Sequence, residues 1–529
     1  MSEPTSSSSS ADSADVSLNA AVQSPPTTFG RMLLSMGPGM IIAAAVVGSG
    51  ELIATTRTGA EAGFALLWLI IIGCVSKVFV QVELGRHAVV TGQTTMAALN
   101  SLPGPRARVH WMLWYWVVMF VVSLAQLGGI AHGVGQALAI AWPLDGSYQR
   151  LLKAQDDWAR QSAAPDPDAQ SPENDEPAGV SPDKPRIASP SRPDYRSQGF
   201  ALTDDILWAA IICLGTIPIL VLGRYGTIQW VCTILVAAFT AATVWCVIAL
   251  QFQPDWAISP GDLIDGLRFR LPSGVDRWAA LGTALATFGI IGMGTNELIT
   301  YPYWCLEKGY AKHAGRPRDS LDWIQRARGW MRVMQWDAFL SMIVYTFATA
   351  AFYLLGAAVL FRAGLKPEGS RLIVTLGEMY APVFGAWTQV LFLGGAVAVL
   401  YSTFFSATAG HARVASDALG MFLGREARPD RPPPTSWVIA FSIGFPLFSL
   451  ATCLLYREPV SLIIASGFMQ AVMLPMLAGA AIFFRYRACP PPLRPGTRWD
   501  ILLWISAAAL LVAGVASAFF AIRPWILPR

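Results

Sequence analysis

Charged residues are scarce in this chain. Only 14% of its 529 residues are Asp, Glu, Lys or Arg, whereas soluble domains carry about 25%. This scarcity excludes an ordinary soluble domain, and a formal net charge of +4 is too small to indicate a nucleic-acid partner. Hydrophobic residues make up 54% and the mean hydropathy is +0.46. The solvent of most of the chain is therefore lipid, and its 20 Trp agree, because Trp concentrates at membrane interfaces.

Cysteine pairs and catalytic motifs are also missing. The seven cysteines are scattered and none forms a C-x-x-C pair, so we expect packing residues rather than disulfides or metal thiolates. No phosphate-binding loop, nucleophile elbow or zinc spacing is present, so we expect neither an enzyme nor a cofactor. Residues 1–30 lack the basic and apolar regions of a signal peptide, and their Ser-rich composition predicts a disordered tail.

Long apolar segments dominate what is present. A membrane-spanning helix takes about 20 apolar residues, and eleven segments qualify: about 32–56, 63–85, 110–142, 203–222, 226–251, 278–304, 333–361, 382–410, 436–456, 458–484 and 500–523. We therefore predict an all-α polytopic membrane protein, with a transporter domain over residues 31–529. The insert at 145–200 is dense in Pro, Asp, Ser and Arg, so we predict a disordered extracytoplasmic loop there.

The loop charges predict an orientation. With a cytoplasmic N-terminus, the cytoplasmic loops hold 19 Lys and Arg residues and the short outer loops hold 8. The positive-inside rule then favours a cytoplasmic N-terminus and, with eleven spans, an extracytoplasmic C-terminus. We expect a multi-pass protein of the cell inner membrane, whose oligomeric state the sequence does not reveal.

Two of the predicted helices share a short motif that is costly inside a membrane. Residues 48–53 read GSGELI and residues 294–299 read GTNELI, at an offset of five helices. Glycine in mid-helix costs about 1 kcal/mol relative to Ala, and a carboxylate at the bilayer centre costs about 2.5 kcal/mol or more. Helices broken at such positions expose carbonyls and helix ends that can coordinate a cation. The motif therefore predicts a five-plus-five inverted repeat, over about 31–251 and 277–484 with an extra helix at 500–523, and a binding site where helices one and six are broken.

Fragments along the chain resemble the Nramp divalent-metal transporters. They are MGPG at 36–39, TG at 58–59, GF at 63–64, VVTG at 89–92, WD at 336–337, ST at 402–403, AG at 409–410 and LP at 474–475. The resemblance covers nearly all of residues 30–525. It implies a leucine-transporter-like fold, alternating access, and proton-linked uptake of divalent cations such as manganese or iron.

The signature motifs of that family are altered here. Its Asp-Pro-Gly-Asn motif aligns with Gly48 to Glu51, and its Met-Pro-His motif aligns with Met293 to Thr295. The carboxylate has moved to Glu51, and a second one, Glu297, lies near Met293. Family alignment pairs Glu51 with Asn296, whereas the internal repeat pairs it with Glu297.

These positions define the expected site. Carboxylates and carbonyls suit Mn²⁺ or Mg²⁺, and a thioether softens a site toward Fe²⁺. The metal or substrate ligands that we expect are Gly48, Glu51, Met293, Thr295, Asn296, Glu297 and Gln126. Of two neighbouring carboxylates, one could carry a proton. For a proton path or gate we expect Asp337 and His132. Alternatively, Asp337 could be a carboxylate near a helix N-terminus, stabilised by the helix dipole, and His132 could be a core histidine whose hydrogen bonds are satisfied.

Two rival functions stay open. The same fold could carry an organic solute or amino acid in a remodelled pocket, or it could serve as a membrane sensor that transports nothing. Lys77 and Glu83, both in helix two, are expected near the membrane interface, where they extend to water or pair.

Overall fold

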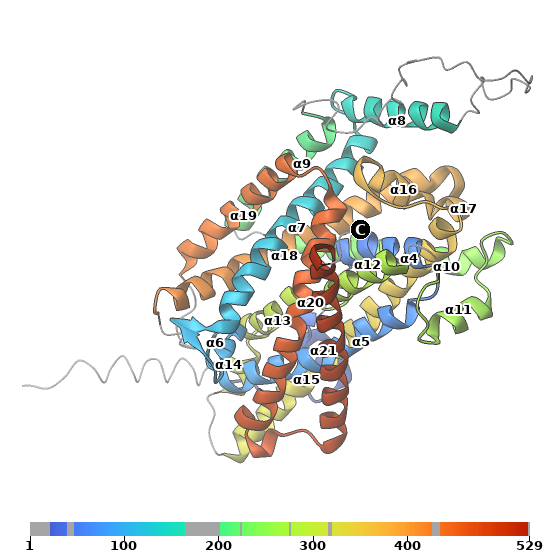
Figure 1. Ribbon diagram of the computed structural model, residues 1–529. Helices are drawn as coiled ribbons and strands as arrows, with labels where there is room; N and C mark the ends of the chain where they lie inside the picture. Colours follow the sequence, from blue (N-terminus) through green and yellow to red (C-terminus); the bar gives the residue numbers. More distant parts are fainter. Residues whose placement is uncertain are drawn as a thin grey trace, which may run out of the picture.

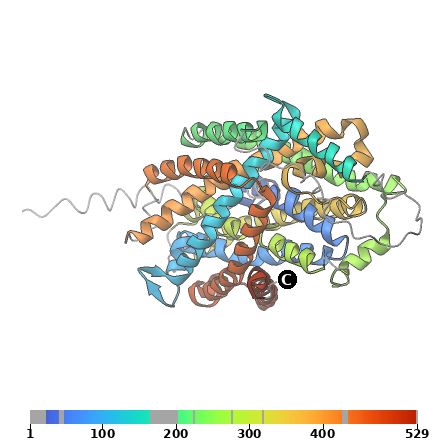
Figure 2. The same cartoon turned by 45° about the horizontal axis from the view of Figure 1, so that its top comes forward.

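The computed structural model describes residues 22–39, 47–163, 202–222, 225–273, 277–315, 320–425 and 434–526. Over these residues the molecule is almost wholly helical, and its long helices lie alongside one another in a bundle (Figure 1). Two short strands, β1 (Arg106–Ala107) and β2 (Val109–His110), pair antiparallel near one end of the bundle. The second view shows the same bundle tilted toward the reader (Figure 2).

Ten helical segments of the described chain are long and apolar enough to cross a membrane. They are α5 (Leu67–Thr91), α7 (Trp111–Ala141), α9 (Asp204–Val221), α10 (Tyr225–Ala249), α12 (Arg277–Ile290) with α13 (Thr295–Glu307), α15 (Leu321–Leu355) with η4 (Gly356–Phe361), α18 (Thr388–Phe422), α19 (Thr435–Leu455), α20 (Pro459–Phe483) and α21 (Thr497–Ile526). The first expected span includes residues 40–46, which lie outside the described residues. Its described part continues as η1 (Gly50–Thr55) and α4 (Thr56–Ala62).

Shorter elements join these helices. They are α2 (Phe29–Ser35), α6 (Thr95–Asn100), α8 (Ser147–Ala163), η3 (Leu250–Phe252), α11 (Pro260–Leu267), α14 (Tyr310–Ala314), η5 (Gly369–Arg371), α16 (Leu372–Glu378), α17 (Ala381–Phe384), η6 (Gly385–Trp387), η7 (Phe484–Ala488) and η8 (Pro491–Leu493). In Figure 1, α8 lies across one end of the bundle, while α6 and α14 lie toward the other.

The helices differ in how much of their surface the protein covers. The most apolar window of the α12–α13 segment is 78% buried and that of α5 is 72% buried, against 28% for α19 and 33% for α21. The outer helices therefore turn apolar side chains outward, as lipid-facing helices do. Helix six, formed by α12 and α13, lies at the centre with α5 and α20 packed against it.

Helix one is widened at the predicted break. Residues Gly50–Thr55 form a π-helical turn, a rare element that is frequent at functional sites. The Thr55 hydroxyl donates to the Gly50 carbonyl at 3.0 Å and so joins the two ends of this turn. The GSGELI motif therefore predicted the position of this irregularity.

Helix six is interrupted outright. α12 ends at Ile290, a turn follows, and α13 begins at Thr295 after Gly294. In the turn Gly292 has φ +57°, and a Cβ there would lie 2.9 Å from the Tyr345 ring and 3.2 Å from the Cys74 backbone. Both the left-handed conformation and the close approach require glycine. The predicted breaks in helices one and six are confirmed.

The expected disorder of residues 145–200 is wrong for its first part. Ser147–Ala163 form α8, whose Tyr148 is buried and donates from its hydroxyl to the Ser370 carbonyl at 2.6 Å. The Gln155 amide donates to the Ser370 hydroxyl at 2.8 Å. The Pro- and Asp-rich composition of the whole insert concealed this amphipathic stretch. Residues 164–200 lie outside the described residues.

The end of the expected N-terminal tail is also ordered against the bundle. The Gln23 backbone N–H donates to the His313 backbone carbonyl at 3.1 Å, and the Trp330 indole donates to the Gln23 backbone carbonyl at 3.0 Å. Pro25 lies against Gly329, which leaves no space for a Cβ there. Residues 22–28 therefore follow α14 and α15, which the prediction of a disordered tail over residues 1–30 missed. Residues 1–21 lie outside the described residues.

Candidate functional site

The Glu51 carboxylate joins the two breaks. It is fully buried in η1 and accepts three hydrogen bonds. One carboxylate oxygen accepts from the Gly48 amide at 3.2 Å, within helix one. The other accepts from the Gly292 amide at 3.0 Å, in the turn of helix six, and from the Thr349 hydroxyl of α15 at 3.4 Å. One side chain therefore connects helices one, six and seven at mid-bundle.

Glu297 lies on the opposite side of the helix-six break. It belongs to the first turn of α13, where the helix dipole favours a negative charge. A Cβ on Gly294 would collide with the Glu297 carboxylate, so this side chain turns back over the break. Met293, which precedes that glycine, is fully buried. Three of the expected residues, Glu51, Met293 and Glu297, thus gather around one turn.

A chain of polar side chains extends the site to α7 and α20. The Gln126 amide nitrogen donates to the Ser49 hydroxyl at 3.3 Å. The Gln126 carbonyl oxygen accepts from the Ser466 hydroxyl at 2.7 Å and from the Gln470 amide at 3.2 Å. Gln470 was not among the predicted residues. A lone Gln in the apolar run of helix ten was the available signal, since a buried amide needs partners.

Thr295 and Asn296 contact the same α20 residue. The Thr295 hydroxyl donates to the Gln470 backbone carbonyl at 2.7 Å. The Asn296 backbone N–H donates to the Gln470 side-chain oxygen at 3.4 Å. The start of α13 is therefore capped from α20, and Gln126 and Gln470 line the break together.

Gly48 differs from the other expected ligands because it packs against a neighbouring helix. A Cβ at this position would overlap the Thr403 hydroxyl of α18, so helices one and eight touch there. Gly48 contributes its amide to Glu51 and has no side chain to offer as a ligand. Gly48 is thus a helix-packing position, and its role as a ligand remains a prediction.

A lysine that the sequence placed at the membrane interface lies at the break. Lys77 of α5 is fully buried and its ammonium donates to the carbonyls of Phe288 at 2.5 Å and Ile291 at 2.8 Å. The alternative that it pairs with Glu83 is also wrong, because Glu83 binds Arg86 at 3.1 Å and the Trp499 indole at 2.6 Å.

Asp337 holds the start of helix one. Its carboxylate accepts from the amides of Gly37 at 3.2 Å and Gly39 at 2.5 Å, and from the Tyr301 hydroxyl of α13 at 3.4 Å. It is fully buried in α15, which begins sixteen residues earlier at Leu321. The carboxylate therefore does not cap its own helix. This side chain instead joins the start of helix one to helices six and seven.

His132 has a partner in helix four. Its Nε2 lies 2.8 Å from the Asp205 carboxylate, and both side chains are fully buried. This pair connects α7 to the first turn of α9. The expected core role, a histidine satisfied by a neighbour, describes this contact, and a proton path through it remains a prediction.

The described residues hold no group of three or more His, Cys, Asp or Glu side chains placed to bind one metal ion. Donors at the breaks are instead of mixed type: two carboxylates, two side-chain amides and a thioether.

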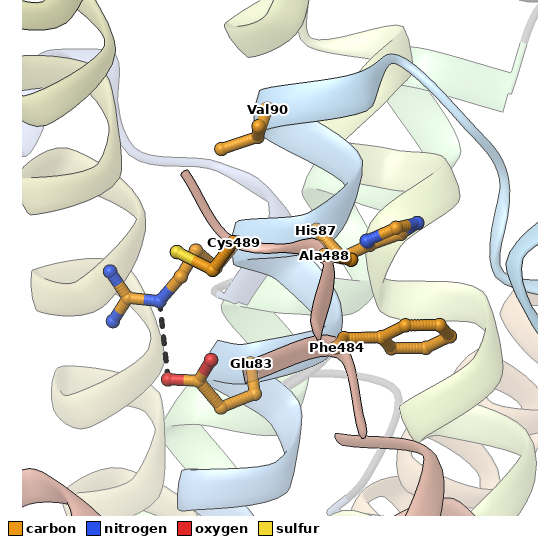
Figure 3. Close-up of a pocket in the computed structure, with 7 residues that line it drawn as sticks. Glu83, His87, Val90, Phe484, Ala488 and Cys489 are labelled. Atoms are coloured by element: carbon orange, nitrogen blue, oxygen red, sulfur yellow. Dashed lines mark hydrogen bonds and ion pairs between the residues drawn. The ribbon is translucent and has the colours of Figure 1, made fainter. Parts of the chain in front are cut away.

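A small pocket lies elsewhere, further along α5 (Figure 3). It is lined by Glu83, Arg86, His87, Val90, Phe484, Ala488 and Cys489.

A family model matches most of this chain, and individual relatives match shorter parts of it. The model of the natural resistance-associated macrophage protein-like (Nramp) family matches residues 39–144 and 199–519. A divalent metal cation transporter, MntH, of Mycobacterium tuberculosis is 31% identical over 105 residues, which cover 20% of this chain and 23% of that protein. Metal transporter Nramp2 of Populus trichocarpa is 30% identical over 125 residues, which cover 23% of this chain and 22% of that one. The chain thus aligns with less than a quarter of the length of these relatives.

The fold also has a solved counterpart. A crystal structure of a manganese transporter from Eremococcus coleocola superposes with a TM-score of 0.61, at 13% identity, over 96% of this chain and 91% of that one. At this identity the likeness shows the fold alone. It confirms the expected class, a leucine-transporter-like bundle with helices one and six broken.

Proposed function

The chain belongs to the Nramp family, and we propose that it is a secondary active transporter of divalent metal cations that works by alternating access. The family is one of metal transporters rather than enzymes. The observation that carries the proposal is the pair of carboxylates, Glu51 and Glu297, on the broken helices of a transporter fold. Broken helices place carbonyls and helix ends beside these carboxylates, where a cation can be coordinated.

The donor types favour a cation between hard and soft. Carboxylate and amide oxygens come from Glu51, Glu297, Gln126 and Gln470, and a thioether comes from Met293. Oxygen ligands suit Mg²⁺ and Mn²⁺, whereas a thioether favours softer ions. We propose a Mn²⁺- or Fe²⁺-like ion as the substrate, with Mg²⁺ as the alternative.

Proton linkage is part of the proposal. Glu51 accepts from the Gly292 amide in the helix-six turn, and Glu297 turns back over the same break, so two carboxylates of like charge lie beside one turn. A proton on one of them would relieve that repulsion when no metal is bound. Protons and a divalent cation would then compete for the same carboxylates.

The proposed location is the cell inner membrane with a cytoplasmic N-terminus. The Lys and Arg distribution supports this orientation. Lys308 and Lys312 near α14 would then face the cytoplasm and anionic lipid, together with the ordered end of the N-terminal segment.

Uptake into proteoliposomes tests the proposal. We expect the wild-type protein to take up Mn²⁺ or Fe²⁺, faster with an acidic exterior, and Glu51→Gln to lose most of that uptake. Glu378→Gln makes the same change at an exposed position in α16 and is expected to transport normally. If folded wild-type protein carries none of Mn²⁺, Fe²⁺, Cd²⁺ or Mg²⁺, the proposal is wrong, and an organic solute or a sensor role becomes the next hypothesis.

A further inference from the structure

The Lys77 ammonium occupies a place where a free cation would bind. Its side chain reaches from α5 to the C-terminal end of α12 and donates to the carbonyls of Phe288 at 2.5 Å and Ile291 at 2.8 Å. The ammonium also lies 5.1 Å from the centre of the Phe288 ring, within the range of a cation–π contact. The side chain is fully buried.

The carbonyls are free for this role because the helix ends there. The last carbonyls of a helix have no partner within it, and they form the negative end of the helix dipole. In transporters with broken helices such C-terminal ends coordinate coupling ions. A lysine ammonium is a compact charge with three donors, so it satisfies carbonyls much as a small monovalent cation does.

Two carboxylates and a thiol are the titratable groups around the Lys77 ammonium. Glu51 of η1 and Glu297 of α13 are the carboxylates that act on the ammonium, and the Cys74 thiol one turn away on α5 is the third titratable neighbour. Tyr345 of α15 donates its hydroxyl to the Cys74 carbonyl at 3.4 Å and so joins α15 to the same part of α5.

The peptide group between Ile291 and Gly292, in the turn of helix six, is therefore bound on both of its polar atoms. Lys77 binds the carbonyl of Ile291, and Glu51 binds the amide of the next residue, Gly292. An uncompensated charge buried this deeply is strongly unfavourable. The Lys77 ammonium is therefore stabilised jointly by the opposite charge of Glu51 and by the two carbonyls that it binds.

We propose that the end of α12 is a binding site for a small monovalent cation, which this chain fills permanently with its own Lys77. The tethered ammonium holds the helix-six break closed without a bound alkali ion. This inference goes beyond the proposed function, since it concerns a second, monovalent site and not the transported ion.

Chemical rescue of Lys77→Ala tests it. We expect the purified variant to lose roughly 2–5 °C of Tm and to regain it in a concentration-dependent manner with Na⁺ or ethylammonium, which fit the vacated space. Choline at the same ionic strength should restore nothing, because it is too bulky and lacks N–H donors. Wild-type protein and Lys312→Ala, an exposed lysine of α14, should respond equally to all these salts.

Two results would overturn the inference. The first is a Lys77→Ala protein that is as stable as wild type, or one that is destabilised and responds identically to ethylammonium and choline. The second result concerns Lys77→Met, which fills the space without a charge and is used if Lys77→Ala cannot be purified. The inference predicts that Lys77→Met is less stable than wild type and insensitive to small cations. Stability of Lys77→Met at or above that of wild type would mean that no cation belongs there. None of these readouts depends on metal uptake, so failure of the proposed function is detected separately.

Discussion

Asp337 offers the most quantitative prediction about alternating access. In the described structure its carboxylate binds the amides of Gly37 and Gly39 at the start of helix one. Asp337→Asn replaces one oxygen by an NH₂ group, which cannot accept from an amide. The shorter bond, 2.5 Å to Gly39, should keep the remaining oxygen, and the Gly37 amide then loses its acceptor.

The size of the effect follows from the two bonds. A hydrogen bond to a charged group contributes about 1.5–3 kcal/mol, and a neutral one about 0.5–1.5 kcal/mol. Losing one charged bond and weakening the other costs roughly 2–4 kcal/mol in the state with helix one docked. Since 1.4 kcal/mol is a factor of ten, the docked population should fall by about 30-fold to several hundred-fold relative to the undocked one.

Hydrogen–deuterium exchange of the peptide around residues 29–39 measures this directly. Asp337→Asn should accelerate exchange at these amides by a factor in that range, up to the limit set by the unfolded chain. The matched control is Asp322→Asn, which changes an exposed carboxylate in the first turn of the same helix. Equal exchange rates in wild type and Asp337→Asn would refute the conclusion that this carboxylate keeps helix one docked.

Two further predictions concern the helix-six turn and the N-terminal segment. Gly292→Ala should destabilise the protein by roughly 2–4 kcal/mol through a left-handed Ala and overpacking against Tyr345. Gly424→Ala, at φ +78° after α18 and with open space around it, should cost only the backbone part, and equal losses of the two variants in thermal unfolding would exclude the packing contribution. His313 lies outside the membrane-spanning helices, and burial, with the charges of Lys308 and Lys312, holds its pKa below the ordinary 6.5. As the pH falls, the unfolded chain therefore binds a proton at His313 before the folded chain does, so the stability of the folded state should fall below about pH 6.5. Limited proteolysis of the segment at 22–28 should show this fall in wild type and a weaker one in His313→Gln.

The sequence located the breaks because their signal is local. A glycine and a carboxylate inside an apolar run are unfavourable in any ordinary helix, so GSGELI and GTNELI identified η1 and the turn before α13 without knowledge of their neighbours. The count and order of long apolar helices were predictable for the same reason, since about 20 apolar residues suffice to recognise each one.

The partners of these residues could not be found in this way. Lys77 binds carbonyls more than 200 positions further along the chain, so its sequence neighbours give only an apolar helix with one charge. Gln470 likewise meets Gln126 across 344 positions. α8 is a different case, because the spacing of Tyr148, Leu151 and Gln155 on one face was readable. The composition of the longer insert outweighed it.

The hydrogen bonds of Glu51 also limit how a cation can bind there. A carboxylate offers about four lone-pair positions, and the amides of Gly48 and Gly292 and the Thr349 hydroxyl take three of them. A divalent ion that uses Glu51 must therefore bind through the remaining position or displace one of these donors. Displacing Gly292 would release the turn of helix six, and displacing Gly48 would release helix one. An ion that displaces either amide would therefore change the breaks themselves, which is the structural requirement for coupling binding to alternating access.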